Sequence, residues 1–91
     1  MLSEILQENE VYYSEYRNLL SKAQWKLLIA LAKEEGIIQV TSSAFMRKHN
    51  LSNAATVRRG IKSLLEKFMI YKSDKKYFVY DVFFAIWLKQ L

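Results

Sequence analysis

Apolar residues recur every three or four positions along most of this chain, which is the spacing of amphipathic helices. Five segments show this spacing: residues 3–19, 22–35, 43–49, 52–68 and 82–91. Between them, Ile37, Ile38 and Val40 predict a short edge strand, and the alternation that follows Phe68 predicts a two-stranded hairpin. The pattern therefore predicts a mainly helical α+β fold with a small sheet near the end of the chain.

Short polar residues mark the expected ends of the helices. Ser21, followed by Gln24 three positions later, predicts a capping box at the start of the second helix, and Gly36 predicts its left-handed C-cap. Asn50 predicts a left-handed turn after the third helix, and Ser52 is the expected N-cap of the fourth. The third and fourth helices are thus expected to be joined by a tight turn.

The fourth helix has two chemically different sides. At 100° per residue, the apolar side carries Val57, Ile61, Leu64, Leu65 and Phe68, and the polar side carries Ser52, Thr56, Arg59 and Ser63. Gly60 in the middle of this helix costs about 1 kcal/mol relative to alanine, which predicts that another helix approaches closely there. One side is therefore expected to pack, and the other is expected to contact a partner.

The segment after the fourth helix alternates with a period of two, as strands do. Its apolar positions are Met69, Tyr71, Tyr77 and Val79, set against Lys72 and Lys76. Ser73, Asp74 and Lys75 supply the turn between the strands. Because this turn lacks the glycine of the tightest hairpins, we expect a longer loop or a bulge.

The last helix, which Asp81 is expected to cap, is apolar on nearly every side. Such a helix is stable only against a partner surface, and the tyrosines of the first helix, Tyr12, Tyr13 and Tyr16, are natural packing partners. We therefore expect the two terminal helices to pack on each other. Incomplete packing would leave apolar surface for a dimer mate or a neighbouring domain.

Three central helices followed by a basic hairpin, with a further helix at each end, are typical of a winged helix-turn-helix domain. We expect a three-helix core, a two- or three-stranded wing, and extra N- and C-terminal helices. The 91 residues include no proline and no internal repeat or low-complexity linker, and this length suffices for one core. Residues 1–91 are therefore expected to form a single domain.

Composition argues against several classes of function. The chain has no cysteine, which removes disulfides and most zinc sites and suits a reducing, cytoplasmic location. No apolar run approaches the roughly 20 residues of a membrane span, so we expect no membrane partner. Gly36 and Gly60 lie outside any glycine-rich loop, and His49, the single imidazole, is most simply a cation at a helix C-terminus. We therefore expect no enzyme activity, cofactor or metal in this chain.

The net charge of +5 is concentrated in one part of the chain. Residues 47–76 hold nine lysines and arginines against Glu66 and Asp74, whereas residues 1–20 hold four glutamates against Arg17. A cluster of positive charge favours a polyanionic partner through phosphate neutralisation and counterion release. The alternative is a solvated basic face that keeps the domain in solution.

The expected contacts to double-stranded DNA lie on the fourth helix, just before it, and on the wing. They are Arg47, Lys48, Ser52, Asn53, Thr56, Arg58, Arg59, Lys62, Ser63, Lys72, Lys75 and Lys76. Arg59 is best suited to bidentate bonding with guanine or to a phosphate contact, while Arg58 and Lys62 are expected to flank phosphates. The wing lysines are expected at the neighbouring backbone or minor groove, although charged edge strands also prevent aggregation.

Three segments carry a resemblance to a known family: LLSKAQWKLLIALAKE, TSSAFMRKHNLSNAATVRRGIKSLLEKFMIYK and YFVYDVFFAIWL. Over about residues 19–88, the chain resembles the C-terminal winged-helix domain of the archaeal-type AAA ATPases of archaea and Bacteroides-like bacteria. The terminal motif of that family is aspartate, proline, two bulky apolar residues and a tryptophan. Asp81, Phe83, Phe84 and Trp87 match this motif, and Val82 stands where proline is usual.

The resemblance implies that this chain is the C-terminal part of a longer ATPase whose ATP- and magnesium-binding motifs lie upstream. It supports residues 52–67 as the recognition helix and residues 72–76 as the wing. Three hypotheses follow. The first is a module that binds duplex DNA with little or no sequence preference. The second is a protein-interaction module that docks on its ATPase domain or on a homodimer mate, and a stand-alone transcription regulator ranks third.

Overall fold

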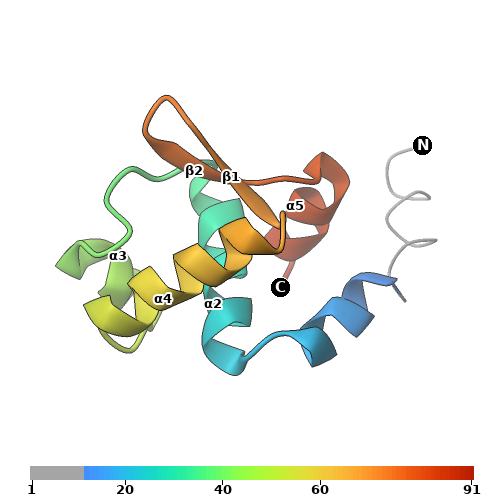
Figure 1. The fold of residues 1–91 in the computed structure, drawn as a ribbon, viewed down its shortest axis with the longest axis horizontal. Helices are drawn as coiled ribbons and strands as arrows, with labels where there is room; N and C mark the ends of the chain where they lie inside the picture. Colours follow the sequence, from blue (N-terminus) through green and yellow to red (C-terminus); the bar gives the residue numbers. More distant parts are fainter. Residues whose placement is uncertain (1–11) are drawn as a thin grey trace.

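The computed structural model describes residues 12–91, and Figure 1 shows the arrangement of their helices and strands. Residues 12–19 are helical and are called the 12–19 helix below. The elements that follow are α2 (Lys22–Glu34), α3 (Ser43–Lys48), α4 (Ala54–Glu66), β1 (Ile70–Ser73), β2 (Lys76–Val79) and α5 (Val82–Lys89). This order confirms the predicted winged helix-turn-helix with a helix at each end. The predicted first turns of the first helix, residues 3–11, lie outside the described residues.

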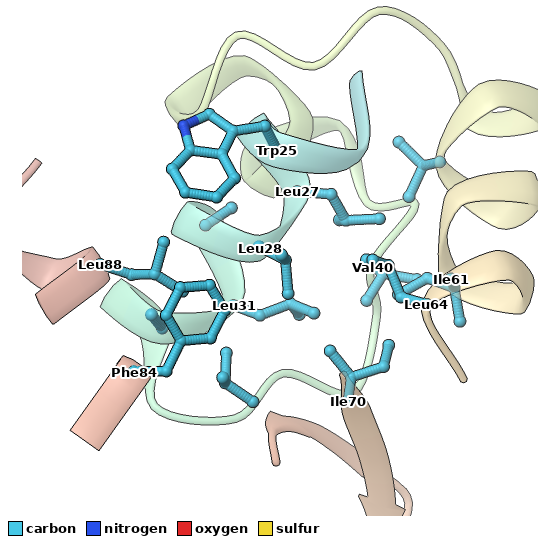
Figure 2. Packing of buried hydrophobic residues seen from close by; sticks show 14 of the residues in the cluster. Trp25, Leu27, Leu28, Leu31, Val40, Ile61, Leu64, Ile70, Phe84 and Leu88 are labelled. Carbon is cyan, nitrogen blue, oxygen red and sulfur yellow. The ribbon is translucent and has the colours of Figure 1, made fainter. Parts of the chain in front are cut away.

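The central helix of the fold is α2, which contacts α4 on one side and α5 on the other. Leu28, at its middle, is completely buried. In Figure 2, Leu27 points toward Ile61 on α4, while Phe84 and Leu88 of α5 approach α2 from the opposite side. Burial of side chains of this size stabilises a fold by about 1.5–3 kcal/mol each. The wide apolar stripe of α2 therefore joins the helix-turn-helix to the C-terminal helix.

Gly60 marks the place where α4 approaches α2. A Cβ atom added to Gly60 would lie 2.9 Å from Cδ2 of Leu27, which is closer than a normal van der Waals contact. The predicted packing reason for this glycine is therefore confirmed.

Most of the predicted caps are present. Ser21 and Gln24 form the capping box, in which Oγ of Ser21 accepts from the Gln24 amide at 3.1 Å and Oε1 of Gln24 accepts from the Ser21 amide at 2.9 Å. Asp81 caps α5, with its Oδ1 accepting from the amide of Phe83 at 2.9 Å. Asn50 has φ of 53° and ends the α3 turn as predicted.

Two predicted caps are displaced by one residue. The N-cap of α4 is Asn53 rather than Ser52, and Oδ1 of Asn53 accepts from the Thr56 amide at 2.9 Å. The left-handed C-cap of α2 is Glu35, with φ of 53°, and Gly36 follows it with φ of 102°. The predicted cap at Gly36 is therefore one residue too late. Glycine is required at position 36 for a different reason, since a Cβ there would overlap the ring of Phe78, where the wing packs on the backbone.

The predicted edge strand at residues 37–40 is reduced to a single bridge. The amide of Tyr77 donates to the carbonyl of Ile37 at 3.0 Å, and the amide of Ile37 donates back at 3.4 Å. The chain then turns, and Val40 is buried in the core. The prediction of a strand was wrong because Val40 packs beside Ile61 and Leu64 of α4 instead of continuing the sheet (Figure 2).

The wing turns through two residues, and the predicted longer loop is wrong. Ser73 pairs with Lys76, so that Asp74 and Lys75 are the central residues, with φ of 52° and 67°. Positive φ at both central positions is the property of the type I′ turn, whose twist matches that of the two strands. The pairing of the strands therefore imposes this turn without a glycine.

The chain leaves α4 through a left-handed residue, and this turn sets the orientation of β1. Phe68 has φ of 58°, its amide donates to the carbonyl of Leu65 at 3.1 Å, and the Met69 amide donates to the carbonyl of Leu64 at 3.0 Å, which is a Schellman motif. Phe68 is 78% exposed, so its predicted place on the buried side of α4 is wrong.

As a result, the inward positions of β1 differ by one residue from the prediction. Ile70 is 2% exposed and pairs with buried Val79, whereas Tyr71 is 40% exposed and stacks on Phe78 with 5.4 Å between ring centroids. In β2 the predicted inward Val79 is confirmed.

The 12–19 helix packs on α5, as expected of the terminal helices. The ring centroid of Tyr13 lies 5.1 Å from that of Phe84 and 5.4 Å from that of Trp87, and Tyr16 lies 5.2 Å from Phe84. Burial, followed by the charge of Asp81, raises the pKa of the Tyr13 hydroxyl above its ordinary value. Within residues 12–91, no helix has the length and apolar character needed to cross a membrane.

Candidate nucleic-acid interface

Three cations lie on the side of α4 that is turned away from the core. Val57 on the opposite side is buried, whereas Arg58, Arg59 and Lys62 are exposed. Among residues 12–91, none of these three cations forms an ion pair with a carboxylate. Nη2 of Arg59 donates a long hydrogen bond, 3.4 Å, to Oγ1 of Thr56. The three charges are therefore available to an external anion.

The charges of α4 are also arranged against the stability of the helix itself. Its first turn contains no acidic residue, its last turn contains no basic residue, and Glu66 occupies its C-terminal position. The helix dipole favours the reverse arrangement by about 0.3–1 kcal/mol per charge. Because the charges of α4 do not stabilise the helix, they are consistent with a role in binding.

The cations before the turn have different surroundings. Nζ of Lys48 lies 2.7 Å from Oε1 of Glu34, and Nε2 of His49 lies 3.0 Å from the same oxygen. The hydrogen bond from Lys48, followed by that with His49, holds the pKa of Glu34 below its ordinary value. Lys48 and His49 therefore tie α3 to the end of α2. Arg47 is exposed and forms no ion pair within the described part of the chain.

The uncharged polar residues predicted at the interface have different surroundings in the structure. Ser52 is exposed, and Asn53 and Thr56 form the N-cap of α4 described above. Ser63 is half-buried, and its Oγ accepts a hydrogen bond of 2.8 Å from Nε2 of Gln24. The Ser63 hydroxyl thus joins α4 to the start of α2, one helical turn after Arg59.

The three wing lysines are all exposed, but they are not equivalent. Lys75 lies in the turn, and neither Lys75 nor Lys76 has an ion-pair partner among the residues that the structure describes. Nζ of Lys72 lies 5.4 Å from the ring centroid of Tyr77, a cation–π contact worth about 0.5–1 kcal/mol at an exposed site. Lys72 therefore has a structural role within the wing.

A hollow of about 280 Å³ lies between the start of α2 and the start of α4. Its polar lining comes from Lys22, Lys26, Asn50, Ser52 and Thr56. A second hollow, of about 330 Å³, adjoins it at the turn and includes Arg47. Neither Lys22 nor Lys26 was predicted at the interface. Their spacing of four residues on one helix was the available signal, but only the fold brings them beside α4.

A different, apolar hollow of about 600 Å³ lies between the 12–19 helix, the end of α4 and the start of α5. Its lining includes Leu19, Phe68 and Tyr80, all of which are largely exposed. The periodicity of α4 assigned Phe68 to the core, so the contribution of Phe68 to this surface was not predicted. The molecule therefore has a cationic surface around α4 and a separate apolar surface at the other end of the same helix.

Comparison with known proteins agrees with the observed arrangement of helices and hairpin. A family model described as "probable winged helix domain" matches residues 11–90. No curated protein and no solved structure matches the chain. Because the family match spans nearly all of the 91 residues, the chain belongs to this family of winged helix domains.

Proposed function

We propose that this domain is a non-catalytic module that binds duplex DNA with little or no sequence preference. The observation that carries the proposal is the group of three exposed cations on α4, Arg58, Arg59 and Lys62, which have no carboxylate partner among the described residues. In a winged helix, such a helix fits the major groove while the hairpin lies on the adjacent backbone.

The exposed cations divide between two kinds of contact. The forked guanidinium of Arg59 can form two hydrogen bonds with the edge of a guanine or with a phosphate. Arg58 and Lys62 flank Arg59 and suit contacts to phosphates. Arg47, before the turn, and Lys75, at the tip of the wing, extend the same charge along the backbone. Binding then depends mainly on counterion release, which explains why we expect weak sequence preference.

Arg59→Ala and Lys62→Ala, each alone, test this function. Each is expected to weaken binding to a duplex of mixed sequence by about five- to tenfold at 0.1 M salt, because one phosphate contact is lost. Arg17→Ala, which removes an exposed cation from the 12–19 helix, is the matched control and is expected to leave affinity unchanged. Fluorescence anisotropy measures affinity, and thermal melting verifies the fold. Wild-type protein that fails to bind duplex at low salt would exclude the proposal.

We also propose that the domain is the C-terminal part of a longer, cytoplasmic AAA-type ATPase, in which ATP and magnesium are bound upstream. The support is the resemblance described above, together with the winged helix fold and the cap that Asp81 forms at the start of α5. A phosphate-binding Walker motif in the reading frame upstream of residue 1 would support the proposal, and an upstream region without one would contradict it.

The apolar hollow favours a second function, docking on the ATPase domain or on a second copy of this chain. Phe68 is held exposed in a left-handed conformation that phenylalanine disfavours, beside exposed Leu19 and Tyr80. Sedimentation of the domain, and its binding to the ATPase domain in trans, measure this function. Phe68→Ala is expected to abolish either association, whereas Tyr12→Ala, which removes an exposed aromatic outside the hollow, is the control. A domain that stays monomeric and ignores the ATPase domain would exclude it.

A further inference from the structure

We infer that the start of α2 is a second phosphate-contacting part of the interface, with Lys22 and Lys26 holding the DNA backbone at the hollow beside α4. The inference rests on the proposed function and deepens it. It extends the interface beyond the segment 47–76 to residues 21–46, which hold three lysines against Glu34 and Glu35 and so contribute little net charge, and it assigns a role to two lysines that the fold alone does not require.

The position of these lysines follows from the packing of α2 on α4. Lys22 and Lys26 are four residues apart, which places them one above the other on one face of α2. This face borders the hollow of about 280 Å³ that Ser52 and Thr56 of the helix-turn-helix line from the other side. The two lysines and the start of α4 therefore border one concave surface.

The electrostatics of α2 make both charges unfavourable in the free protein. Lys22 is the first residue of the helix, where the dipole repels a cation, and the first turn contains no acidic residue. Like charges four residues apart also repel each other. Within residues 12–91, no carboxylate pairs with either lysine. An anion in the hollow relieves both unfavourable interactions. DNA that is bound by the neighbouring cations of α4 would bring a backbone phosphate to this position.

The arrangement defines how the duplex crosses the domain. In Figure 1 the start of α2 lies below α4, while the hairpin lies above it. A duplex that receives α4 in its groove thus meets cations on both flanks: the wing lysines on one side and Lys22 with Lys26 on the other. Contacts to phosphates on both sides of a groove fix the orientation of the recognition helix.

Lys22→Glu gives the sharpest test, because stability and binding are expected to change in opposite directions. The acid at the first helical position suits the dipole and forms a favourable pair with Lys26, so the melting temperature is expected to rise by about 2 °C. Affinity for duplex DNA is expected to fall at least tenfold, since a contact is lost and a repulsive charge is added.

Lys22→Gln and Lys26→Gln complete the test by a salt titration. Each is expected to reduce the slope of log affinity against log salt by about 0.9, the value for one phosphate contact. Lys33→Gln is the matched control, because Lys33 lies at the other end of α2, where it donates to the carbonyl of Leu91 at 2.8 Å. It is expected to leave the slope unchanged.

The outcomes separate this inference from the proposed function. If Arg59→Ala weakens binding but the Lys22 and Lys26 variants behave like Lys33→Gln, the DNA-binding function stands and the role of α2 is overturned. If the wild-type domain does not bind duplex at low salt, both are overturned. A reduced slope in both Gln variants, together with a more stable but weaker-binding Lys22→Glu, supports the inference.

Discussion

Asn50 and Phe68 occupy equivalent positions, because each is the left-handed residue that ends a helix. Both helix ends are Schellman motifs; the one at Asn50 is closed by the Leu51 amide, which donates to the carbonyl of Met46 at 2.8 Å. Asparagine tolerates this conformation, whereas other residues lose about 1–2 kcal/mol in it. Since Phe68 is largely exposed, burial of its ring offsets little of this strain.

We expect Phe68→Gly to raise the free energy of unfolding by about 0.5–1 kcal/mol, because glycine adopts positive φ without strain but gains entropy in the unfolded chain. Asn50→Gly is the control, and we expect a change of only a few tenths of a kcal/mol there. Urea unfolding followed by circular dichroism measures both. A loss of stability in Phe68→Gly would mean that the exposed ring contributes to folding.

The two glycines respond differently to a methyl group. Gly36→Ala is expected to lower the free energy of unfolding by at least about 2 kcal/mol, since φ of 102° is strained for alanine and the Phe78 ring blocks the Cβ. In Gly60→Ala, the gain of about 1 kcal/mol in helix propensity offsets the contact with Leu27, so the net change is expected to be small. Thermal melting of the two variants provides the comparison, and equal losses would contradict this account.

One carboxylate, Glu34, links α3 to α2, because its Oε1 contacts both Lys48 and His49. These bonds lower its pKa in the folded state relative to the unfolded state, so the folded protein binds its proton less tightly. The stability that they contribute is therefore present above the ordinary pKa of 4.5 and is lost as the pH falls through the lowered value. The contact of Glu34 with Lys48 and His49 thus helps to hold α3, which precedes α4 in the candidate interface.

We expect Glu34→Gln to be less stable than the wild type at pH 7, and the difference to shrink as the pH falls below about 4.5, the ordinary pKa of the carboxyl. Glu15→Gln alters an exposed carboxylate that has no ion-pair partner within residues 12–91; it is the control and is expected to follow the wild type. Urea unfolding at several pH values tests this. A difference that does not change between pH 7 and pH 3 would show that Glu34 does not act through its charge.

Prediction of individual elements was most accurate where local interactions decide their ends. The capping box of α2 and the Asp81 cap require only residues within one turn, so their spacing along the chain identifies them. The inward side of β1 depends instead on the left-handed turn at Phe68 and on pairing with β2. A phase error of one residue exposes every side chain expected inside, which is why Tyr71 was placed in the core.

For the molecule as a whole, the proposed DNA surface combines α4, the wing and the residues before the turn. Six exposed cations there have neither a carboxylate nor an aromatic partner among residues 12–91: Arg47, Arg58, Arg59, Lys62, Lys75 and Lys76. Their relative positions follow from the packing of α4 against α2 and β1, because isolated helices and hairpins of this length are only marginally stable in water.

We expect affinity for duplex DNA to fall about a thousandfold between 50 and 200 mM salt, because about six phosphate contacts release their counterions. Titration of one duplex at several salt concentrations measures the slope. An uncharged competitor of equal size, such as a neutral nucleic-acid analogue, is expected to bind weakly under all conditions. Binding that is indifferent to salt would indicate that the apolar surface, and not the cationic one, contacts the ligand.

From the sequence alone, it was possible to predict the winged helix-turn-helix class, four of the five helices within a few residues, and most of the candidate cations. Helical periodicity and caps depend on residues within one or two turns of each other. Once the apolar side of α4 is assigned to the core, the same periodicity places Arg58, Arg59 and Lys62 on the solvent side. These features are set by neighbours along the chain.

Only the tertiary structure decided the two-residue turn of the wing, the loss of the strand at residues 37–40, the exposure of Phe68 and the meeting of Lys22 and Lys26 with α4. Each of these depends on contacts between segments that are distant along the chain, such as Phe78 on the backbone of Gly36. Local spacing contains no information about such contacts, because it is the packing of whole elements that brings the two segments together.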